Sequence, residues 1–346
     1  MATTIKDIAE KAGVSISTVS LILNNKGRVA HSTRQQVETI IRDLNYRPLH
    51  SARKLATQMT GNVGYIIWEE YFSEVEMFYS QVFLGMECAA RVNDYYILLT
   101  TVKEKFNPKT DLPRFLKYND VDGVVLVGRV PMTLIEYLDH QKIPFVLIDY
   151  EVPGKNYNYI KIDNYNGAFR AVENLVLSGR KNIAFVGGSY FHPSIKERYR
   201  GYREALEIHN FEISRIEKYS YRKNIETSRS VGEAGAAYLL EAYPEIDAIF
   251  ACTDHTALGV IEGIQKLNRK IPDEIAIIGF DDISLAMYNK PKLSTLSVPK
   301  MEIGKAAFKL LNELINNPGM APQTRVLSVD LIIRESSLSN GDGNRP

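Results

Sequence analysis

The sequence predicts two folded parts: an α-helical headpiece of the helix-turn-helix type, and an α/β body made of two doubly wound parallel-sheet subdomains. Three observations support this fold class. Apolar residues recur at the spacing of short helices within residues 1–48. From Asn62 onward, apolar strand-like runs alternate with amphipathic helical stretches. With 346 residues, the chain is also longer than one compact domain usually is.

The basic residues of the chain are concentrated near the N-terminus. Residues 1–60 contain nine Lys and Arg and four Asp and Glu, whereas the rest of the chain contains 33 and 37. A small basic part joined to a mildly acidic body indicates that only the N-terminal part binds a polyanion. A solvated surface can also be basic for no functional reason, so this observation needs a fold to support it.

Composition excludes several classes of protein. The only cysteines, Cys88 and Cys252, are far apart and form neither a disulfide framework nor a metal-binding spacing. No run approaches the roughly 18 uncharged apolar residues that a membrane span needs. The first residues lack the basic-then-apolar pattern of an export signal. We therefore expect a cytoplasmic protein with no metal, no cofactor and no membrane contact.

Three short helices are predicted in the headpiece. The first follows the capping pair Thr4 and Asp7, the second follows Gly13 and Ser15, and the third begins near Ser32. A helix, a Gly-containing turn and a second short helix form the arrangement that places the second helix in a DNA major groove. The expected inward-facing residues of the three helices are Ile5, Ile8, Ala9, Ala12, Val19, Ile22, Leu23, Val37, Ile40, Ile41 and Leu44.

The second predicted helix turns a mixed surface away from its apolar side. The hydroxyls of Ser15, Ser17 and Ser20 suit hydrogen bonds to phosphates and base edges. Exposed Ile16 or Leu21 side chains suit contact with a thymine methyl group. The apolar spacing alone would equally allow a generic three-helix bundle, so spacing leaves DNA binding open.

The run from Thr4 to Asn24, TIKDIAEKAGVSISTVSLILN, resembles the signature of the lactose-repressor (LacI/GalR) family. Thr33-Arg34 with Val37, and the run Leu44–Pro48, extend the resemblance. It implies a sequence-specific DNA-binding transcription regulator, typically a repressor of carbohydrate-utilisation genes, on a near-palindromic operator. The DNA-contacting residues that it implies in the headpiece are Thr4, Ser15, Ile16, Ser17, Ser20, Leu21, Asn24, Arg28 and Thr33.

The same resemblance implies a hinge helix at about residues 49–57, which forms when a dimer binds its operator. Leu55 would enter the minor groove and unstack a base step, and Arg53 would lie along that groove or a phosphate. A linker leucine that packs on the body is the alternative for Leu55. Two positions depart from the family pattern: Leu21 replaces a common Arg, and Ala30 replaces a usual Ser whose cap Ser32 can partly supply. The operator should therefore differ.

In the body, eight strands and four helices stand out. The expected strands are Val63–Trp68, Tyr95–Thr100, Gly123–Val127, Phe145–Ile148, Tyr159–Ile162, Ile183–Val186, Ala248–Ala251 and Ile275–Gly279. The expected helices are Gln81–Val92, Asn166–Leu177, Glu197–Ile208 and Thr256–Leu267. Two successive sets of such elements predict two subdomains.

Polar residues follow several of these strands, where open α/β sheets bind their ligands. Carboxylates, an arginine and aromatic rings together suit a sugar, because its hydroxyls need donors and acceptors and its apolar face stacks on rings. Asp163 and Asp254 stand next to predicted helices and can equally be caps. The strand-end candidates are Asp149, Asp163, Thr253, Asp254, Asp281 and Asp282.

The body also resembles that of the LacI/GalR family, and with it the periplasmic-binding-protein-like fold of sugar-binding proteins. The motifs are Asp163-Asn164 with Gly167, the segment Arg198–Tyr202, Thr253-Asp254 with Ala257, and Gly279–Asp282. They imply that a small effector, expected to be a sugar, binds between the subdomains. The implied effector contacts are Asp149, Arg198, Asp254 and Asp281.

Two further assignments concern the effector site. Relatives often carry Asn at the position of Thr253, so this residue changes the hydrogen-bonding set that meets the effector. Aromatic and acidic residues after the first strand can form the wall of the first subdomain, with Trp68 and Phe78 as first choices. The wider set of wall candidates is Trp68, Glu69, Tyr71, Phe72, Phe78 and Tyr79.

The predicted organisation follows from these assignments. The segment Ser337–Pro346 is short and polar, unlike the leucine-rich tail of tetrameric relatives, so a homodimer is expected. The expected parts are the headpiece 1–48, the hinge and linker 49–60, the N-terminal effector subdomain 61–162 with 292–324, the C-terminal effector subdomain 163–291 with 325–338, and a disordered tail 339–346.

Two other classes of function were weighed against a regulator. A solute-binding receptor has a similar body, but the basic headpiece and the absence of an export signal disfavour it. A hydrolase or sugar-modifying enzyme would use the clustered carboxylates, yet the sequence contains no nucleophile elbow, phosphate loop, dinucleotide fingerprint or zinc motif. We therefore expect a protein that is not an enzyme.

Overall fold

The structure is a computed structural model that describes residues 4–23, 27–44, 59–72, 78–188, 192–222 and 227–338. The chain divides into two compact units, Met1–Gly61 and Asn62–Pro346. Each unit has its own hydrophobic core, as expected for parts that fold around separate sets of apolar residues. None of the helices within the described segments combines the length and apolar character that a bilayer span requires.

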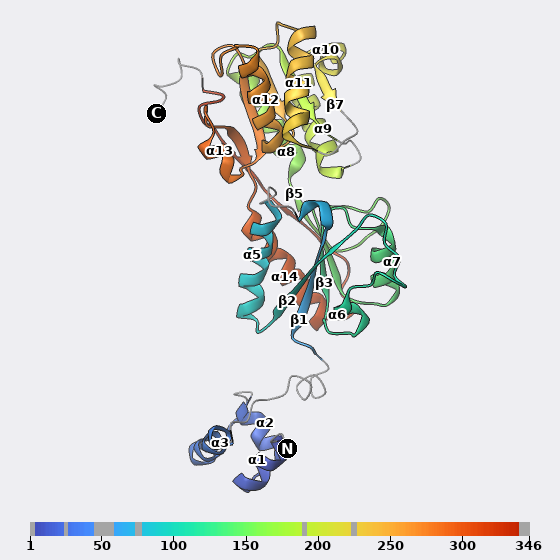
Figure 1. The fold of residues 1–346 in the computed structure, drawn as a ribbon, viewed down its shortest axis with the longest axis vertical. Coiled ribbons are helices and arrows are strands. Elements are labelled where there is room, and N and C mark those ends of the chain that lie inside the picture. Colours follow the sequence, from blue (N-terminus) through green and yellow to red (C-terminus); the bar gives the residue numbers. More distant parts are fainter. Residues whose placement is uncertain are drawn as a thin grey trace. The chain divides into compact units, whose positions relative to one another are not determined.

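The described residues of the headpiece form three helices around one small core (Figure 1). They are α1 (Ile5–Ala12), α2 (Ile16–Leu23) and α3 (His31–Asp43). The predicted apolar spacing is confirmed, because the fully or nearly buried residues are Ile8, Ala9, Ala12, Val19, Ile22 and Val37. The remaining predicted core residues pack against these at partial burial.

Local side chains begin and end these helices largely as expected. Thr4 and Asp7 form a capping box, in which the Asp7 carboxylate accepts from the Thr4 N–H at 2.7 Å. Gly13 ends α1 with a φ of 62°, which residues with a Cβ rarely adopt. The Ser15 hydroxyl accepts from the Thr18 N–H at 3.1 Å. Helix α3 begins at His31, next to the predicted start near Ser32, and Ala30 at its N-cap makes no side-chain hydrogen bond.

In the part of the body that the structure describes, the strands form two six-stranded sheets. The first has the order β11-β5-β4-β3-β1-β2, all parallel. Its strands are β1 (Asn62–Trp68), β2 (Tyr96–Val102), β3 (Val124–Val127), β4 (Phe145–Ile148), β5 (Tyr159–Ile162) and β11 (Thr324–Leu327). The second has the order β12-β10-β9-β8-β6-β7, parallel except for the pair β10 and β12. Its strands are β6 (Ile183–Gly187), β7 (Ser220–Arg222), β8 (Ala248–Ala251), β9 (Ala276–Asp281), β10 (Ser294–Ser297) and β12 (Asp330–Ile332).

Helices cover both faces of each sheet, which buries the nearly continuous apolar strands (Figure 1). The elements around the first sheet are η1 (Glu69–Tyr71), α5 (Phe78–Val92), α6 (Arg114–Lys117), α7 (Met132–His140) and α14 (Lys300–Asn316). Those around the second are α8 (Asn164–Leu177), α9 (Pro193–Ile208), α10 (Ile213–Lys218), α11 (Arg229–Ala242), α12 (Asp254–Lys266) and α13 (Ser284–Tyr288). This architecture confirms the predicted fold class.

Helices α5 and α14 lie unusually close together on one face of the first sheet (Figure 1). A Cβ placed on Gly85 would lie 2.0 Å from the Met301 carbonyl oxygen, and one on Gly304 would lie 1.9 Å from the Val82 carbonyl oxygen. Only glycine at these two positions permits such backbone contact. The N-terminal ends of the two helices, at Phe78 and Lys300, therefore lie near each other.

The predicted subdomain boundaries need two corrections. The segment 292–324 was assigned to the first subdomain, but β10 pairs with β9 in the second sheet, so the chain crosses back only after Ser297. The segment 325–338 was assigned to the second subdomain, but β11 pairs with β5 in the first sheet. Both strands were missed because neither is a continuous apolar run, and sheet pairing rather than local sequence makes them strands.

Candidate functional sites

Helix α2 presents a mixed polar and apolar surface. Ser15, Ser17, Ile16 and Leu21 are exposed, while Ser20 is half-buried. Ile16 is 48% exposed and Leu21 40% exposed, although Val19 and Ile22 of the same helix are buried in the core. The core is therefore filled without the side chains of Ile16 and Leu21, which remain exposed. The assignment of this face to DNA recognition stays a prediction.

The remaining headpiece candidates fall into two groups. Thr4 and Arg28 are exposed and Thr33 is half-buried. The Thr4 and Ser15 side chains already act as helix caps, so each would contact DNA while it holds its helix end. Asn24, Arg53 and Leu55, together with the predicted hinge helix at 49–57, lie outside the described residues.

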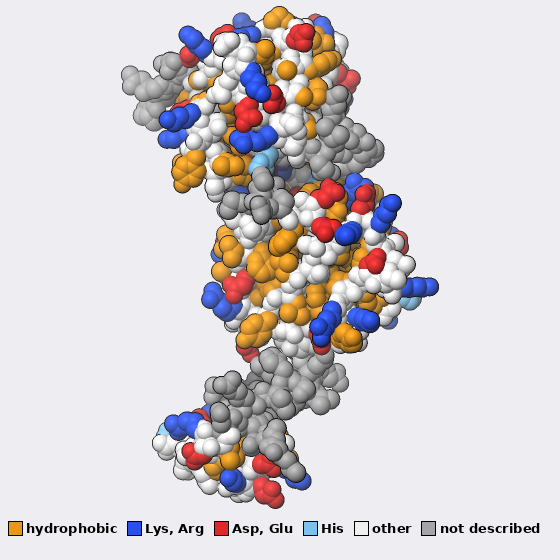
Figure 2. Space-filling model, viewed as in Figure 1, with side chains coloured by type: hydrophobic (Ala, Val, Ile, Leu, Met, Phe, Trp, Pro, Cys, Tyr) orange, Lys and Arg blue, Asp and Glu red, His pale blue; other side chains and the backbone are white. Residues whose placement is uncertain are grey.

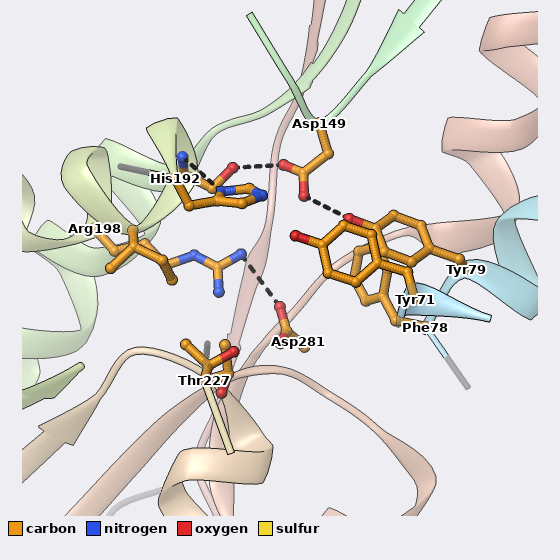
Figure 3. A pocket seen from close by; sticks show the side chains of 11 residues that line it. Tyr71, Phe78, Tyr79, Asp149, His192, Arg198, Thr227 and Asp281 are labelled. Carbon is orange, nitrogen blue, oxygen red and sulfur yellow. Dashed lines mark hydrogen bonds and ion pairs between the residues drawn. The ribbon is translucent and has the colours of Figure 1, made fainter. Parts of the chain in front are cut away.

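A cavity of about 90 Å³ lies where the carboxyl ends of strands from the two sheets of the body face each other (Figure 3). This space would hold several water molecules, and so the hydroxyl groups of a small ligand. Asp149 follows β4, Thr253 follows β8, and Asp281 ends β9. The cavity is lined by Tyr71, Phe78, Tyr79, Asp149, His192, Ser194, Ile195, Arg198, Thr227, Thr253 and Asp281.

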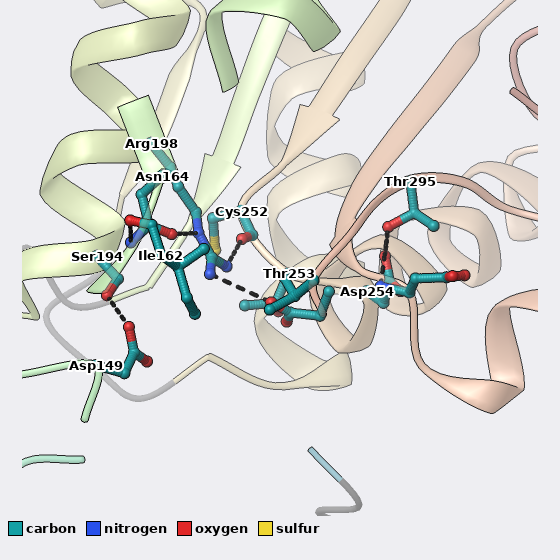
Figure 4. A network of polar contacts seen from close by, with 12 residues as sticks. Asp149, Ile162, Asn164, Ser194, Arg198, Cys252, Thr253, Asp254 and Thr295 are labelled. Carbon is teal, nitrogen blue, oxygen red and sulfur yellow. Dashed lines mark hydrogen bonds and ion pairs between the residues drawn. The ribbon is translucent and has the colours of Figure 1, made fainter. Parts of the chain in front are cut away.

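Arg198 is held in one orientation on the cavity wall. Its Nε donates to the Asn164 Oδ1 at 2.8 Å, and its Nη1 donates to the Cys252 carbonyl oxygen at 2.7 Å (Figure 4). Its Nη2 lies 3.2 Å from the Asp281 Oδ1, and the guanidinium stacks 3.7 Å from the centre of the Phe280 ring. The side chain is only 3% exposed, so these contacts fix a preorganised donor beside an acceptor.

Asp149 joins the two walls of the cavity. Its Oδ1 accepts from the Ser194 hydroxyl at 2.6 Å, and its Oδ2 accepts from the Tyr79 hydroxyl at 3.2 Å (Figure 3). Ser194 lies in α9, which packs on the second sheet. Asp149 follows β4 of the first sheet, and Tyr79 lies in α5, which packs on that sheet. Asp149 also has a φ of 56°, a backbone conformation that is uncommon for a residue with a side chain and often marks functional sites.

His192 contributes an imidazole that the sequence analysis missed. Its Nδ1 accepts from the Ser194 N–H at 3.3 Å and so caps α9. Burial lowers the pKa of His192, against the opposing effect of the Asp149 carboxylate. The neutral ring that this favours carries its proton on Nε2, because Nδ1 is the acceptor. The imidazole thus adds one donor to the cavity without adding charge.

Two predicted effector contacts, Trp68 and Asp254, do not line the cavity. Asp254 is fully buried outside the cavity lining: its Oδ1 accepts from the Thr295 hydroxyl at 2.6 Å and its Oδ2 from the Ile283 N–H at 2.9 Å (Figure 4). Burial, and then the Asp281 charge, raise the pKa of Asp254 well above its ordinary value. Its role is to tie α12 to β10 and the segment before α13. Trp68 does not line the cavity either; it packs edge-to-face on Tyr71 at 4.8 Å and borders a separate hollow.

The other predicted effector residues, Phe78, Asp149, Arg198, Thr253 and Asp281, do line one cavity. Tyr71 and Tyr79 belong to the wider set of predicted wall residues. The lining also includes four residues that were not predicted from the sequence: His192, Ser194, Ile195 and Thr227. Ser194 stands one helical turn before Arg198, so helix periodicity could have found it. His192 precedes a proline at the first position of α9, which is a recognisable N-cap signal. Thr227 follows a segment outside the described residues and had no sequence signal.

Comparisons with known proteins bear on both parts of the chain. Residues 4–48 match the family model "Bacterial regulatory proteins, lacI family", and residues 172–337 match the "Periplasmic binding protein-like domain" model. The chain is 33% identical to the catabolite control protein A of Priestia megaterium, over 91% of this chain and 93% of that protein. It is 30% identical to the transcriptional repressor PurR of Vibrio campbellii, over 96% of this chain and 98% of that protein.

Solved structures agree with these matches. The complex of the transcriptional regulator CelR with cellobiose has a TM-score of 0.73 at 28% identity, covering 97% of this chain and all (100%) of that chain. The lac repressor dimer bound to operator and an anti-inducer has a TM-score of 0.80, covering 98% and 100%. Its identity is 22%, so this likeness shows the fold alone.

The three-helix headpiece and the body, whose two sheets both line one cavity, together define a DNA-binding transcription regulator with a ligand-binding body. PurR, which matches over nearly the whole chain, is a transcriptional repressor, and CelR, whose structure is similar, is a transcriptional regulator. The chain belongs to the LacI family, which confirms the resemblance predicted from the sequence.

Proposed function

We propose that this regulator is a cytoplasmic homodimer that represses carbohydrate-utilisation genes and is controlled by a small, uncharged sugar bound in the body cavity. The observation that carries the proposal is the set of groups around that cavity. Asp149 and Asp281 supply acceptors, and Arg198 supplies fixed donors. The rings of Phe78, Tyr71 and Tyr79 supply a surface against which the apolar face of a sugar packs.

The charge of the cavity lining favours an uncharged ligand. Two carboxylates and one guanidinium line it, and the lowered pKa of His192 keeps the imidazole neutral at neutral pH. A sugar phosphate or a nucleotide would bring negative charge towards Asp149 and Asp281, and among the described lining residues Arg198 is the one cation that could balance it. Uncharged sugars are also consistent with two structural relatives, which are complexes with cellobiose and with ribose.

Control of DNA binding would follow from a population shift. Because the lining comes from both sheets, a ligand that contacts both favours one relative arrangement of the two subdomains. That arrangement would permit or prevent the meeting of the two predicted hinge helices of a dimer on the operator. The effector therefore changes operator affinity only by the difference between its affinities for the two arrangements.

Exposed apolar side chains support the homodimer. On α5 and the edge strand β2, Leu84 is 51% exposed, Val92 85% and Tyr96 66%. Figure 2 shows hydrophobic side chains gathered on the face that carries α5. Apolar patches of this kind mark interaction surfaces, and a second copy of the chain is the partner that we propose. Twofold symmetry would then require a near-palindromic operator.

On the DNA, we propose that α2 enters the major groove and that Leu55 enters the minor groove. Arg28 and Arg53 would contact phosphates or the minor groove, so binding should weaken steeply as salt rises. We further propose that the protein catalyses no reaction, as its relatives are regulators. An operator-binding protein acts where the genes are, which supports a cytoplasmic location.

The test uses the full chain in two assays. Thermal unfolding is followed with D-ribose, D-glucose, cellobiose, glucose 6-phosphate and hypoxanthine, because a ligand of the folded state raises the midpoint by mass action. Operator sequences are selected from a random duplex pool, with and without the stabilising compound. We expect an uncharged sugar to stabilise the protein and to change the affinity for one near-palindromic sequence. Stabilisation by the phosphate or purine alone would contradict the sugar assignment, and no DNA selection would contradict the operator assignment.

A further inference from the structure

A buried lysine outside the cavity lining connects the two cavity walls. Lys300 is the first residue of α14 and is only 5% exposed. Its Nζ donates to three backbone carbonyl oxygens: Asp281 at 2.5 Å, Asp282 at 3.1 Å and Val298 at 3.3 Å. A charged group is buried in a protein only where hydrogen bonds replace its lost hydration, and these three carbonyls meet that need.

Helix stability does not explain this lysine. A cation in the first turn of a helix opposes the helix dipole, which favours negative charge at that end. Lys305 of the same helix shows the usual alternative, since it is exposed and pairs with Glu302 at 2.7 Å. Lys300 instead points away from its own helix towards the end of β9. Its placement therefore serves the contacts that its ammonium group makes.

On one side, those contacts hold the wall that carries Asp281. Asp281 and Asp282 have φ angles of 116° and 53°, which are unfavourable for residues with side chains and need surrounding contacts to persist. Lys300 bonds both of their carbonyl oxygens. The Asp281 carboxylate lines the cavity and lies 3.2 Å from Arg198. The lysine thus supports the backbone that aims this carboxylate.

On the other side, the same ammonium group meets the aromatic wall. It lies 5.6 Å from the centre of the Phe78 ring, within the range of a cation–π interaction. The close approach of α5 and α14 at Gly85 and Gly304 brings the two residues together. From Phe78 the ring contacts continue to Tyr79 at 5.0 Å, then to Tyr71 at 5.3 Å. Trp68 completes the series, 4.8 Å from Tyr71.

We propose that Lys300 is the positioning residue of the effector cavity, whose ammonium group sets the separation of the Asp281 wall from the Phe78 wall. The role as an effector cavity rests on the proposed function. The positioning role itself concerns the protein without ligand, so it is tested without one. Failure of the sugar panel would therefore leave the following test intact.

The test compares Lys300→Met, which removes the charge but keeps an apolar stem of similar length, with Lys300→Arg, which restores a cation. Lys305→Met is the matched control on the same helix. The first readout is acrylamide quenching of the fluorescence of Trp68, the single tryptophan of the chain. The second is amide hydrogen exchange in a peptide spanning residues 279–284.

We expect Lys300→Met to change both readouts. Exchange in 279–284 should accelerate by about tenfold or more, because the variant loses the charge-assisted hydrogen bonds to the Asp281 and Asp282 carbonyl oxygens. Acrylamide quenching of the Trp68 fluorescence should also change, because Phe78, the first ring in the series of contacts that ends at Trp68, loses its contact with the ammonium group. Lys300→Arg should restore most of both signals, and Lys305→Met should match the wild-type chain.

Three results would overturn the proposal. Lys300→Met could leave both readouts at wild-type values, Lys305→Met could change them equally, or Lys300→Arg could fail to restore them. If circular dichroism shows that Lys300→Met does not fold, Lys300→Gln takes its place, because it keeps a donor and lacks the charge. Wild-type values in Lys300→Gln would then show that the charge positions nothing.

Discussion

The Asp149 carboxylate and the Ser194 hydroxyl form a hydrogen bond of 2.6 Å that spans the two sheets of the body. Asp149 follows β4 of the first sheet, and Ser194 lies in the first turn of α9, which packs on the second. The cavity has both residues in its lining, so its shape depends on how the two sheets are arranged. A ligand that binds one arrangement of the sheets more tightly than the other therefore favours that arrangement.

Replacing Arg198 should impair ligand binding selectively. Arg198→Ala removes donors from the cavity and leaves the Asp281 carboxylate without its guanidinium partner. We expect affinity for the stabilising sugar to fall about 10- to 100-fold, the effect of losing hydrogen bonds to a charged group. Operator affinity without sugar should change little. Isothermal titration calorimetry measures the first quantity, and fluorescence anisotropy measures the second.

The control for this change is Arg200→Ala, because Arg200 is more exposed on the same helix and pairs with Glu197. It should leave sugar affinity nearly unchanged. An unaltered titration in Arg198→Ala would remove Arg198 from the effector site.

Replacing Leu55 should have the opposite selectivity. Leu55 lies outside the described residues, and its expected role as a minor-groove wedge rests on the sequence resemblance. Leu55→Ala should weaken operator binding by about tenfold or more, since insertion of an apolar wedge stabilises the bent complex. Leu55→Met keeps an apolar side chain of similar size and should bind nearly as well as the wild type. Equal loss of sugar and operator affinity in Leu55→Ala would contradict the division of roles.

Asp254 should govern stability rather than ligand binding. Asp254→Ala removes the acceptor of the Thr295 hydroxyl and the Ile283 N–H, and should cost about 2–4 kcal/mol in the free energy of unfolding. Urea denaturation measures this loss. Sugar affinity of the folded variant should remain close to that of the wild type, and a large selective loss would return Asp254 to the effector site.

The pH dependence of Asp254 gives a separate test. Its folded pKa is raised above the ordinary value of 3.8, mainly by burial. A carboxyl group of this kind adds stability below its unfolded pKa, and that contribution is lost as the pH rises through its folded pKa. Asp254→Asn stays neutral, so the wild type should lose stability relative to Asp254→Asn as the pH rises above 3.8, the ordinary pKa of the carboxyl group. A constant difference over that range would contradict the raised pKa.

His192 should make sugar binding sensitive to acid. Burial lowers the pKa of His192 below its ordinary value of 6.5, so the ring stays neutral at that pH and gains a proton only at lower pH. Protonation would remove the Nδ1 acceptor that caps α9 and add a charge beside Arg198. Sugar affinity should thus be constant at neutral pH and fall as the pH drops below the ordinary range of histidine. Titrations of His192→Gln should lack this fall; the same pH profile in both proteins would exclude His192 as its cause.

Much of the fold was predictable because it depends on local patterns. The buried strands β1, β3, β4, β6, β8 and β9 are apolar runs, and they were located within one or two residues. β10, by contrast, contains a single strongly apolar residue, Leu296, and becomes a buried strand only by pairing with β9. No local pattern contains that information, which is why the crossing between subdomains was misplaced.

By itself, the sequence determined the family, the two-part organisation and the position of acidic residues at strand ends, because helical spacing, capping and apolar runs act between near neighbours. Only the tertiary structure decided which carboxylates face the cavity. Asp254 and Asp281 both lie where the sequence predicts ligand contacts. The Asp254 carboxylate accepts hydrogen bonds from Thr295 and Ile283, whereas the Asp281 carboxylate lies beside Arg198 in the cavity. The physical reason is that a side chain's partners come from elements far along the chain, and their packing decides which polar groups are satisfied internally and which remain for a ligand.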